Sequence, residues 1–161
     1  WARILRGDKR LENSPLVLVS AGEVALARAE AANLGWTSEN LATVYAQGIQ
    51  LSFEQWGITY NSAFATSSKV AIGAAGAAGN DEKIATQRYI ASYPNGSMGW
   101  NIWRKSGYPT LTPAPDAAGK AIPRRYTYAS SEFTSNKANA EAAVARIAGG
   151  DSQDAKVWWD K

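Results

Sequence analysis

Apolar and small residues recur at helical spacing in the first third of the chain. Ser20 and Glu23 form a capping box, in which Ser20 accepts the Glu23 amide and Glu23 reaches back to the Ser20 amide. Gly35 is suited to end this helix in a left-handed conformation. The inward positions between them are mostly small, namely Val24, Ala27, Ala31 and Leu34. The pattern predicts a helix with a narrow face that allows a close helix neighbour.

The helix predicted to pack against this one follows directly in the sequence. Thr37 or Ser38 can cap a second helix, which ends before Gly57. Its apolar stripe consists of Leu41, Val44, Tyr45, Gly48, Ile49 and Ser52. Because only a few residues join the two helices, we expect an antiparallel hairpin over about residues 20–57.

The middle of the chain alternates between weak and strong helical patterns. A looser helical segment spans Ala63 to Ile72. The glycines and alanines of residues 73–79 supply no side chains to pack, which predicts a flexible connector. Asn80 or Asp81 can then cap a third strong helix that ends at Tyr93-Pro94. Its inward face carries Ile84, Gln87, Ile90 and Ala91.

A fourth helix is predicted to open at Ser97, after the Asn95-Gly96 turn, and to stop at Gly107 and Pro109. It carries Trp100, Ile102, Trp103 and Arg104. With the third helix it predicts a second hairpin over about residues 81–107. The same Asn95-Gly96-Ser97 run fits a glycosylation acceptor, but a turn and a helix cap already explain it.

The last third begins with a proline-rich stretch, predicted as an extended or looped region over residues 108–135. A final helix is expected over about residues 136–148, capped by Ser135 or Asn136. Its inward positions are Ala140, Ala143, Val144 and Ile147. The predicted fold class is therefore all-α, one domain of tetratricopeptide-like helix hairpins with a proline-rich loop segment, although no clean sequence repeat joins the two pairs.

Composition narrows the possible chemistry. The 161 residues are 45% hydrophobic with a net charge of +3, which is typical of a globular domain. The chain has 0 His and 0 Cys, which excludes the common Ser-His-Asp and Cys-His nucleophiles, thiol redox motifs and Cys/His zinc sites. We expect no cofactor and no metal. Residues 1–6 lack the organisation of a secretion signal, and a start on Trp1 without an initiator Met suggests a fragment.

Seven sequence pieces occur in the order and spacing of a known family, and together they cover nearly the whole chain. They are Ser20 to Val24 running into Ala29 to Trp36, then Tyr45 to Ser52, Ile84 to Tyr93, Trp103 to Pro109, Ile122 to Tyr126, and Asn136 to Asn139. The chain resembles the C-terminal part of SusD/RagB-type outer-membrane lipoproteins of Bacteroidota. It departs from the family at Ala129, where a proline is frequent, and at Met98-Gly99, where an acidic residue is frequent.

The resemblance implies a SusD-like fold of tetratricopeptide-like pairs and a function in nutrient capture. Family members bind oligosaccharides, or sometimes peptides, and are not enzymes. The resemblance further implies a surface-exposed outer-membrane lipoprotein whose N-terminal lipid anchor and export signal lie upstream of this chain. The implied partner is a SusC-type TonB-dependent transporter, over which such proteins act as a lid. Much of the family's ligand platform also lies upstream.

A sugar presents apolar C–H faces and polar hydroxyl edges, so an aromatic plane beside amide donors suits it. Trp56, Tyr60 and Asn61 are the candidate ligand contacts, because they surround the Gly57 helix stop, where a loop can present an aromatic ring. Trp100 and Trp103 are expected to be structural. Arg104 and Lys105 are also expected to be structural, because they complement the helix C-terminal dipole.

Other functions are weighed against this one. Arg124 and Arg125 can bind phosphate, but without a basic stripe no nucleic-acid partner is expected, and pairing with carboxylates such as Glu132 or with helix-end carbonyls is the simpler role. Asp151, Asp154 and Asp160 are expected to be solvated charges. A glycoside hydrolase fragment would have to use two of Glu23, Glu30 and Glu132, although no motif selects a pair. A helical scaffold for protein or peptide interaction remains the main alternative.

Overall fold

The computed structural model describes residues 7–160, so the Trp1–Arg6 start and Lys161 lie outside the described residues. Within residues 7–160 the chain is helical and has no strand, which confirms the all-α prediction. No helix in this range is long and apolar enough for a bilayer. The elements are η1 (Gly7–Lys9), α1 (Ala21–Asn33), α2 (Leu41–Gln55), α3 (Ser62–Thr66), α4 (Asn80–Ala91), α5 (Gly96–Ser106), α6 (Ser130–Ser135) and α7 (Lys137–Ala145). The chain divides into two compact units, residues 1–103 and 104–161.

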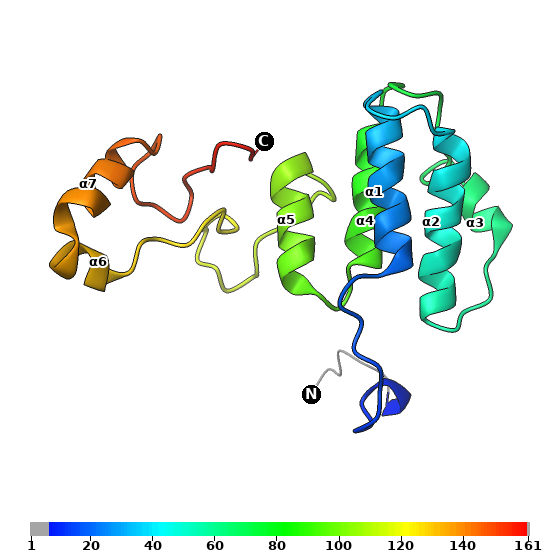
Figure 1. Ribbon diagram of the computed structural model, residues 1–161, viewed down its shortest axis with the longest axis horizontal. Coiled ribbons are helices and arrows are strands. Elements are labelled where there is room, and N and C mark those ends of the chain that lie inside the picture. Colours follow the sequence, from blue (N-terminus) through cyan, green and yellow to red (C-terminus); the bar gives the residue numbers. More distant parts are fainter. Residues whose placement is uncertain (1–6, 161) are drawn as a thin grey trace. The chain divides into compact units, whose positions relative to one another are not determined.

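In the first unit, α1 and α2 form an antiparallel pair with well-defined ends (Figure 1). The Ser20 hydroxyl accepts the Glu23 amide at 3.0 Å, as predicted, but the Glu23 carboxylate binds Arg88 instead of returning to the cap. Gly35 ends α1 with a φ of 71°, which is the predicted left-handed conformation. The cap of α2 is Asn40 rather than Thr37 or Ser38, because the Asn40 Oδ1 atom accepts the Thr43 amide at 2.9 Å.

Two glycines let α1 and α2 approach closely. A Cβ on Gly48 would lie 2.6 Å from the Leu26 Cγ atom, and one on Gly22 would lie 3.0 Å from the Ser52 amide nitrogen. The face of α1 that packs in this way is not the predicted one, since Val24 and Leu34 are exposed. The buried face consists of Gly22, Ala25, Leu26, Ala29, Ala32 and Asn33. In so alanine-rich a helix, two rows of small residues have the same spacing, and the sequence alone favoured the wrong row.

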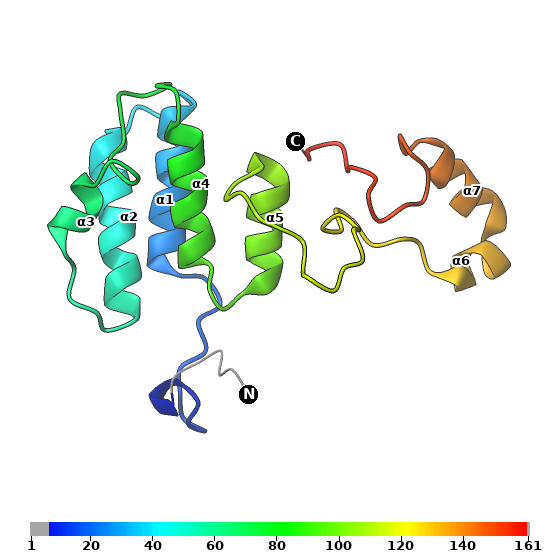
Figure 2. The same ribbon diagram turned by 180° about the vertical axis from the view of Figure 1, so that it is seen from behind.

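The core of the first unit lies where α1 contacts both α2 and α4 (Figure 1 and Figure 2). Leu26, Ile49 and Ile84 are almost fully buried there, one from each helix. The Tyr45 hydroxyl donates to the Val70 carbonyl at 3.0 Å, and burial raises the pKa of this phenol well above its ordinary value. In the first unit, the main partner of α4 is α1. The hairpin of α4 with α5 stays a prediction.

The connector of residues 73–79 differs from the predicted flexible link. The Asn80 side chain accepts the Gly73 amide at 3.0 Å and donates to the Ala74 carbonyl at 2.8 Å. The Asn33 Oδ1 atom accepts both the Gly76 amide and the Asn80 Nδ2 group, at 3.0 and 2.8 Å. Asn80 is therefore not a helix cap, because its buried side chain fixes the connector, and the cap position belongs to Gly79.

The second unit contains α6, α7 and long loops, with α6 inside the stretch predicted as loop. Its loops are joined by charged groups, because Arg125 binds Asp151 at 2.6 Å and Arg124 binds Asp160. The Arg124 amide also donates to the Gln153 carbonyl at 2.7 Å. The prediction that Asp151 and Asp160 are solvated was wrong, and the carboxylates that bind the two arginines are these two rather than Glu132, which accepts from Asn136.

Candidate functional site

A cleft in the first unit is the best candidate site. It lies between the extended segment of residues 14–19, the end of α2 and the joint between α4 and α5. It consists of two adjoining hollows of about 520 and 120 Å³, which share Val17, Leu18, Gln55, Pro94 and Asn95. The larger hollow is also lined by Lys9, Ser14, Pro15, Leu16 and Trp56, and the smaller by Val19, Ser20, Glu23, Ala91, Ser92, Tyr93 and Met98. The larger volume is in the range of small-molecule sites.

Trp56 is fixed in the wall of the cleft by the way α2 ends. Gly57 adopts a φ of 64°, and the amides of Gly57 and Ile58 donate to the carbonyls of Glu54 and Phe53 at 2.9 and 3.0 Å. These two bonds make a Schellman motif that holds the last turn. The Trp56 ring also contacts the Tyr93 ring, with 5.7 Å between centroids and 44° between planes. The cleft therefore has an aromatic wall in a defined position.

Polar groups lie beside this aromatic wall. Asn95 caps α5, since its Oδ1 atom accepts the Met98 amide at 3.1 Å. The Ser14 hydroxyl oxygen accepts the Leu11 amide at 2.9 Å. Within the described part of the chain, the Gln55 amide, the Asn95 Nδ2 group and the Trp56 indole N–H form no side-chain hydrogen bond. These groups can donate to a ligand in the cleft.

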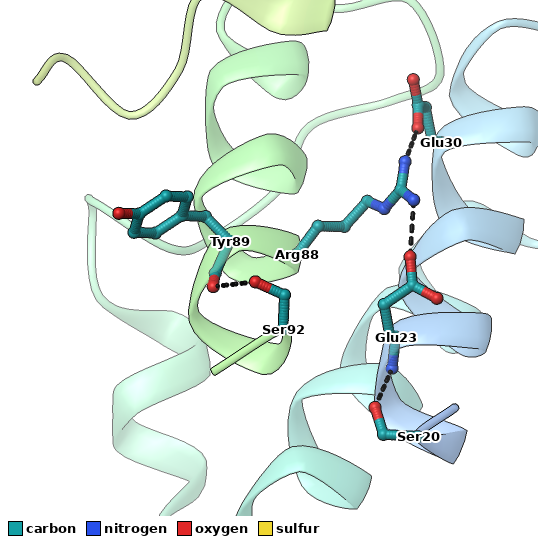
Figure 3. Close-up of polar contacts among 6 residues, drawn as sticks. All are labelled: Ser20, Glu23, Glu30, Arg88, Tyr89 and Ser92. Carbon is teal, nitrogen blue, oxygen red and sulfur yellow. Dashed lines mark hydrogen bonds and ion pairs between the residues drawn. The ribbon is translucent and has the colours of Figure 1, made fainter. Parts of the chain in front are cut away.

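Glu23, which lines the smaller hollow, belongs to a cluster of charges on α1 and α4. Figure 3 shows this cluster. The Arg88 Nη2 group donates to the Glu23 carboxylate at 2.6 Å, and its Nη1 group donates to Glu30. The three side chains are largely buried, with exposed fractions of 14% for Arg88, 14% for Glu23 and 23% for Glu30. The Arg88 guanidinium thus binds both Glu23 and Glu30, two of the three carboxylates considered as catalytic residues of a glycoside hydrolase. These ion pairs join α1 to α4.

The structure separates the three residues predicted as ligand contacts. Trp56 lines the cleft. The Tyr60 ring packs edge-on against Phe53 at 5.6 Å beside the core, and the Asn61 side chain caps α3 by accepting the Ala63 amide at 3.0 Å. Of the three, Trp56 is the candidate that lines the cleft.

Sequence reasoning missed the other cleft residues, because they come from separate segments. Tyr93 and Asn95 were assigned only to a helix stop and a turn, and Lys9 and Gln55 were not singled out. The helix-end signals at Gly57 and Pro94 offered a clue, since loops at one end of a helical bundle share a surface. Trp103 is buried, as expected, and Arg104 is also buried, with its guanidinium 4.6 Å from the centre of the Trp159 ring.

Comparison with known proteins identifies the relatives of this chain. Residues 3–129 match the SusD-like family described as "Starch-binding associating with outer membrane". A SusD-like protein of Bacteroidetes AC2a shares 30% identity with a TM-score of 0.83, and the match covers 97% of this chain and 32% of that one. A comparison with curated proteins found no match.

Two further solved structures give the same result. A chitin-binding protein shares 31% identity with a TM-score of 0.76, covering 96% of this chain and 36% of that one. A SusD homologue from Bacteroides thetaiotaomicron VPI-5482 shares 28% identity with a TM-score of 0.77, covering 93% and 40%. The chain therefore spans about a third of the length of these relatives.

Proposed function

The chain belongs to the SusD-like family, and from this membership we propose that it takes part in capturing oligosaccharide nutrients at the cell surface. The observation that carries the proposal is the family match over residues 3–129, together with a fold match of TM-score 0.83. The SusD-like family is one of non-catalytic, nutrient-binding proteins associated with the outer membrane. The proposed role is accordingly binding without cleavage.

The cleft supports this role by its chemistry. Trp56 offers an apolar plane for the C–H face of a sugar ring, and Gln55 and Asn95 offer amide donors for hydroxyl groups. The family's description names starch and one relative is named for chitin, and both are neutral glycans. We therefore place one sugar contact of this chain at Trp56.

The test is calorimetric titration of the 161-residue chain with maltooligosaccharides and chitin oligosaccharides. Replacing Trp56 by Leu is expected to weaken binding at least about tenfold, because a stacked aromatic contact is lost. Trp36→Leu is the matched control, since Trp36 is 71% exposed and lies outside the cleft. Equal losses from both substitutions would contradict a site at Trp56.

The same mixtures are then chromatographed after long incubation. Unchanged oligosaccharides are expected, and the appearance of shorter sugars would contradict a purely binding function. A chain that binds peptides but no saccharide would instead favour the helical interaction scaffold.

The proposed partner is a SusC-type TonB-dependent transporter, and the proposed location is the outer face of the outer membrane, reached through an N-terminal lipid anchor. The support is the family's association with the outer membrane. A tagged chain, incubated with detergent-solubilised outer membranes of a Bacteroidota species, is expected to retain such a transporter. If the transporter is no more abundant in the retained fraction than other membrane proteins, the partnership is contradicted.

A further inference from the structure

We propose that the cleft at Trp56 accepts a saccharide that carries a negative charge, as a carboxylate or a sulfate ester. This inference rests on the proposed function and narrows its ligand class. The family description and the chitin-binding relative name neutral glycans, so the proposal goes beyond both.

The charge of the lining favours an anionic ligand. Among the described residues that line the larger hollow, Lys9 is the one ionic side chain. Lys9 is half-buried on η1, and the described part of the chain pairs it with no carboxylate. Glu23, the carboxylate among the described lining of the smaller hollow, is bound by Arg88 at 2.6 Å, and Arg88 also binds Glu30. The lining of the larger hollow itself therefore carries one positive charge, which favours an anion beside Lys9.

Several acceptor atoms of the lining are already used, which leaves mainly hydrogen-bond donors. The Asn95 Oδ1 atom and the Ser14 hydroxyl oxygen already accept backbone amides, at 3.1 and 2.9 Å. The Asn95 Nδ2 group, the Ser14 hydroxyl proton and the Lys9 ammonium are left to donate. A lining that is rich in donors suits a ligand that is rich in acceptors, and carboxylate and sulfate are the acceptor-rich groups of natural glycans.

The aromatic and cationic groups line one and the same hollow. Trp56 supplies an aromatic face and Lys9 a cation, and both line the same hollow of about 520 Å³. A sugar ring stacked on Trp56 can therefore carry its charged substituent toward Lys9. Such a site recognises the ring by its apolar face and the substituent by its charge.

The experiment compares charged and neutral forms of the same sugar on the full chain. Oligogalacturonate is titrated against its carboxyl-reduced form, and a sulfated galacto-oligosaccharide against its unsulfated form. At least one charged form is expected to bind about tenfold more tightly than its neutral counterpart, with an advantage that decreases as NaCl is added. The two arms identify whether the carboxylate or the sulfate is the preferred group.

Lys9→Gln tests the residue that carries the proposal. It is expected to weaken binding of the charged sugar at least about fivefold and to leave the neutral form unchanged. Lys69→Gln is the control, because Lys69 is exposed and lies outside the cleft, and it should change neither affinity. Thermal melting of each variant confirms that the fold is retained.

The outcomes separate this inference from the proposed function. Equal affinity for charged and neutral sugars, or an unchanged affinity after Lys9→Gln, would overturn the charged-ligand proposal while glycan binding stands. Failure of every saccharide to bind would overturn both.

Discussion

Different interactions stabilise each of the two compact units internally. Residues 1–103 contain three helices that bury aliphatic side chains such as Leu26, Ile49 and Ile84 against one another. Residues 104–161 contain two short helices and long loops, which are joined by Arg125 to Asp151 and Arg124 to Asp160. Apolar packing distributes the stabilisation over many residues, whereas an ion pair provides it through two side chains. The difference shows that a loop-rich unit can gain order from a few buried charges.

The largest effect is expected from the aliphatic core of the first unit. Ile84→Ala should lower the free energy of unfolding by about 3 kcal/mol, because Ile84 is 1% exposed and its loss leaves a cavity. Ile90→Ala is a matched control on the same helix, where Ile90 is 50% exposed, and should cost well under about 1 kcal/mol. Urea unfolding measures both. Similar values for the two variants would contradict the assigned core face of α4.

The next largest effect on stability is expected from the ion pairs of the second unit. Arg125→Met should destabilise its loops locally by about 2 kcal/mol, because the Asp151 carboxylate, 18% exposed, loses its ionic partner and keeps the Tyr128 amide. Hydrogen exchange at the Arg124 amide, which donates to Gln153, should accelerate accordingly. Lys137→Met breaks an exposed pair with Glu141 and is expected to change nothing measurable. Protection that survives Arg125→Met would show that backbone bonds alone order these loops.

Within the first unit, a polar network around Asn80 fixes the connector of residues 73–79. Asn80→Ala removes its bonds to Asn33, Gly73 and Ala74 and should cost about 1.5 kcal/mol. The Gly73 and Gly76 amides should then exchange faster. Asn139→Ala is the control, because Asn139 is exposed and bonds only to the neighbouring Asn136 side chain. Unchanged exchange after Asn80→Ala would mean that the connector is ordered without this network.

The smallest effect is expected from the exposed pair of Arg28 and Glu39. Hydrogen bonding from Arg28 lowers the pKa of the Glu39 carboxyl below its usual value. The pairing therefore contributes above the pKa of the unfolded chain and is lost as the pH falls through the lower pKa of the folded chain. In an NMR titration, Arg28→Gln should move the Glu39 pKa upward. An unmoved titration would show that the pair does not persist in solution.

Local sequence signals predicted some helix ends, because each end depends on a few adjacent residues, but they missed the caps of α2 and α4. Ser20 caps α1, and Gly35 and Gly107 take the left-handed conformations expected of helix stops. The buried row of α1 was missed, because alanines occupy both candidate rows. The ordered connector was missed because Asn33 and Asn80 are 47 residues apart in the sequence. The partners of Arg124 and Arg125 lie 36 and 26 residues away, beyond any local pattern.

The candidate site was predicted only in part for the same reason. Trp56 follows from a local rule, since it stands where a helix ends at a glycine. Lys9, Gln55 and Tyr93 join it only after the 14–19 segment and the α4–α5 joint meet the end of α2. The resemblance to a family indicated the class of function, but the composition of the cleft needed the tertiary fold.

The contact of Arg88 with Glu23 and Glu30 also has a consequence for the order of folding. The two acids lie 65 and 58 residues before the arginine, whereas the α1–α2 pair is joined by a short loop. Closing the longer loop costs more chain entropy, so the hairpin should form early and α4 should dock late. Substitutions at Arg88 are thus expected to speed unfolding and to leave the refolding rate nearly unchanged.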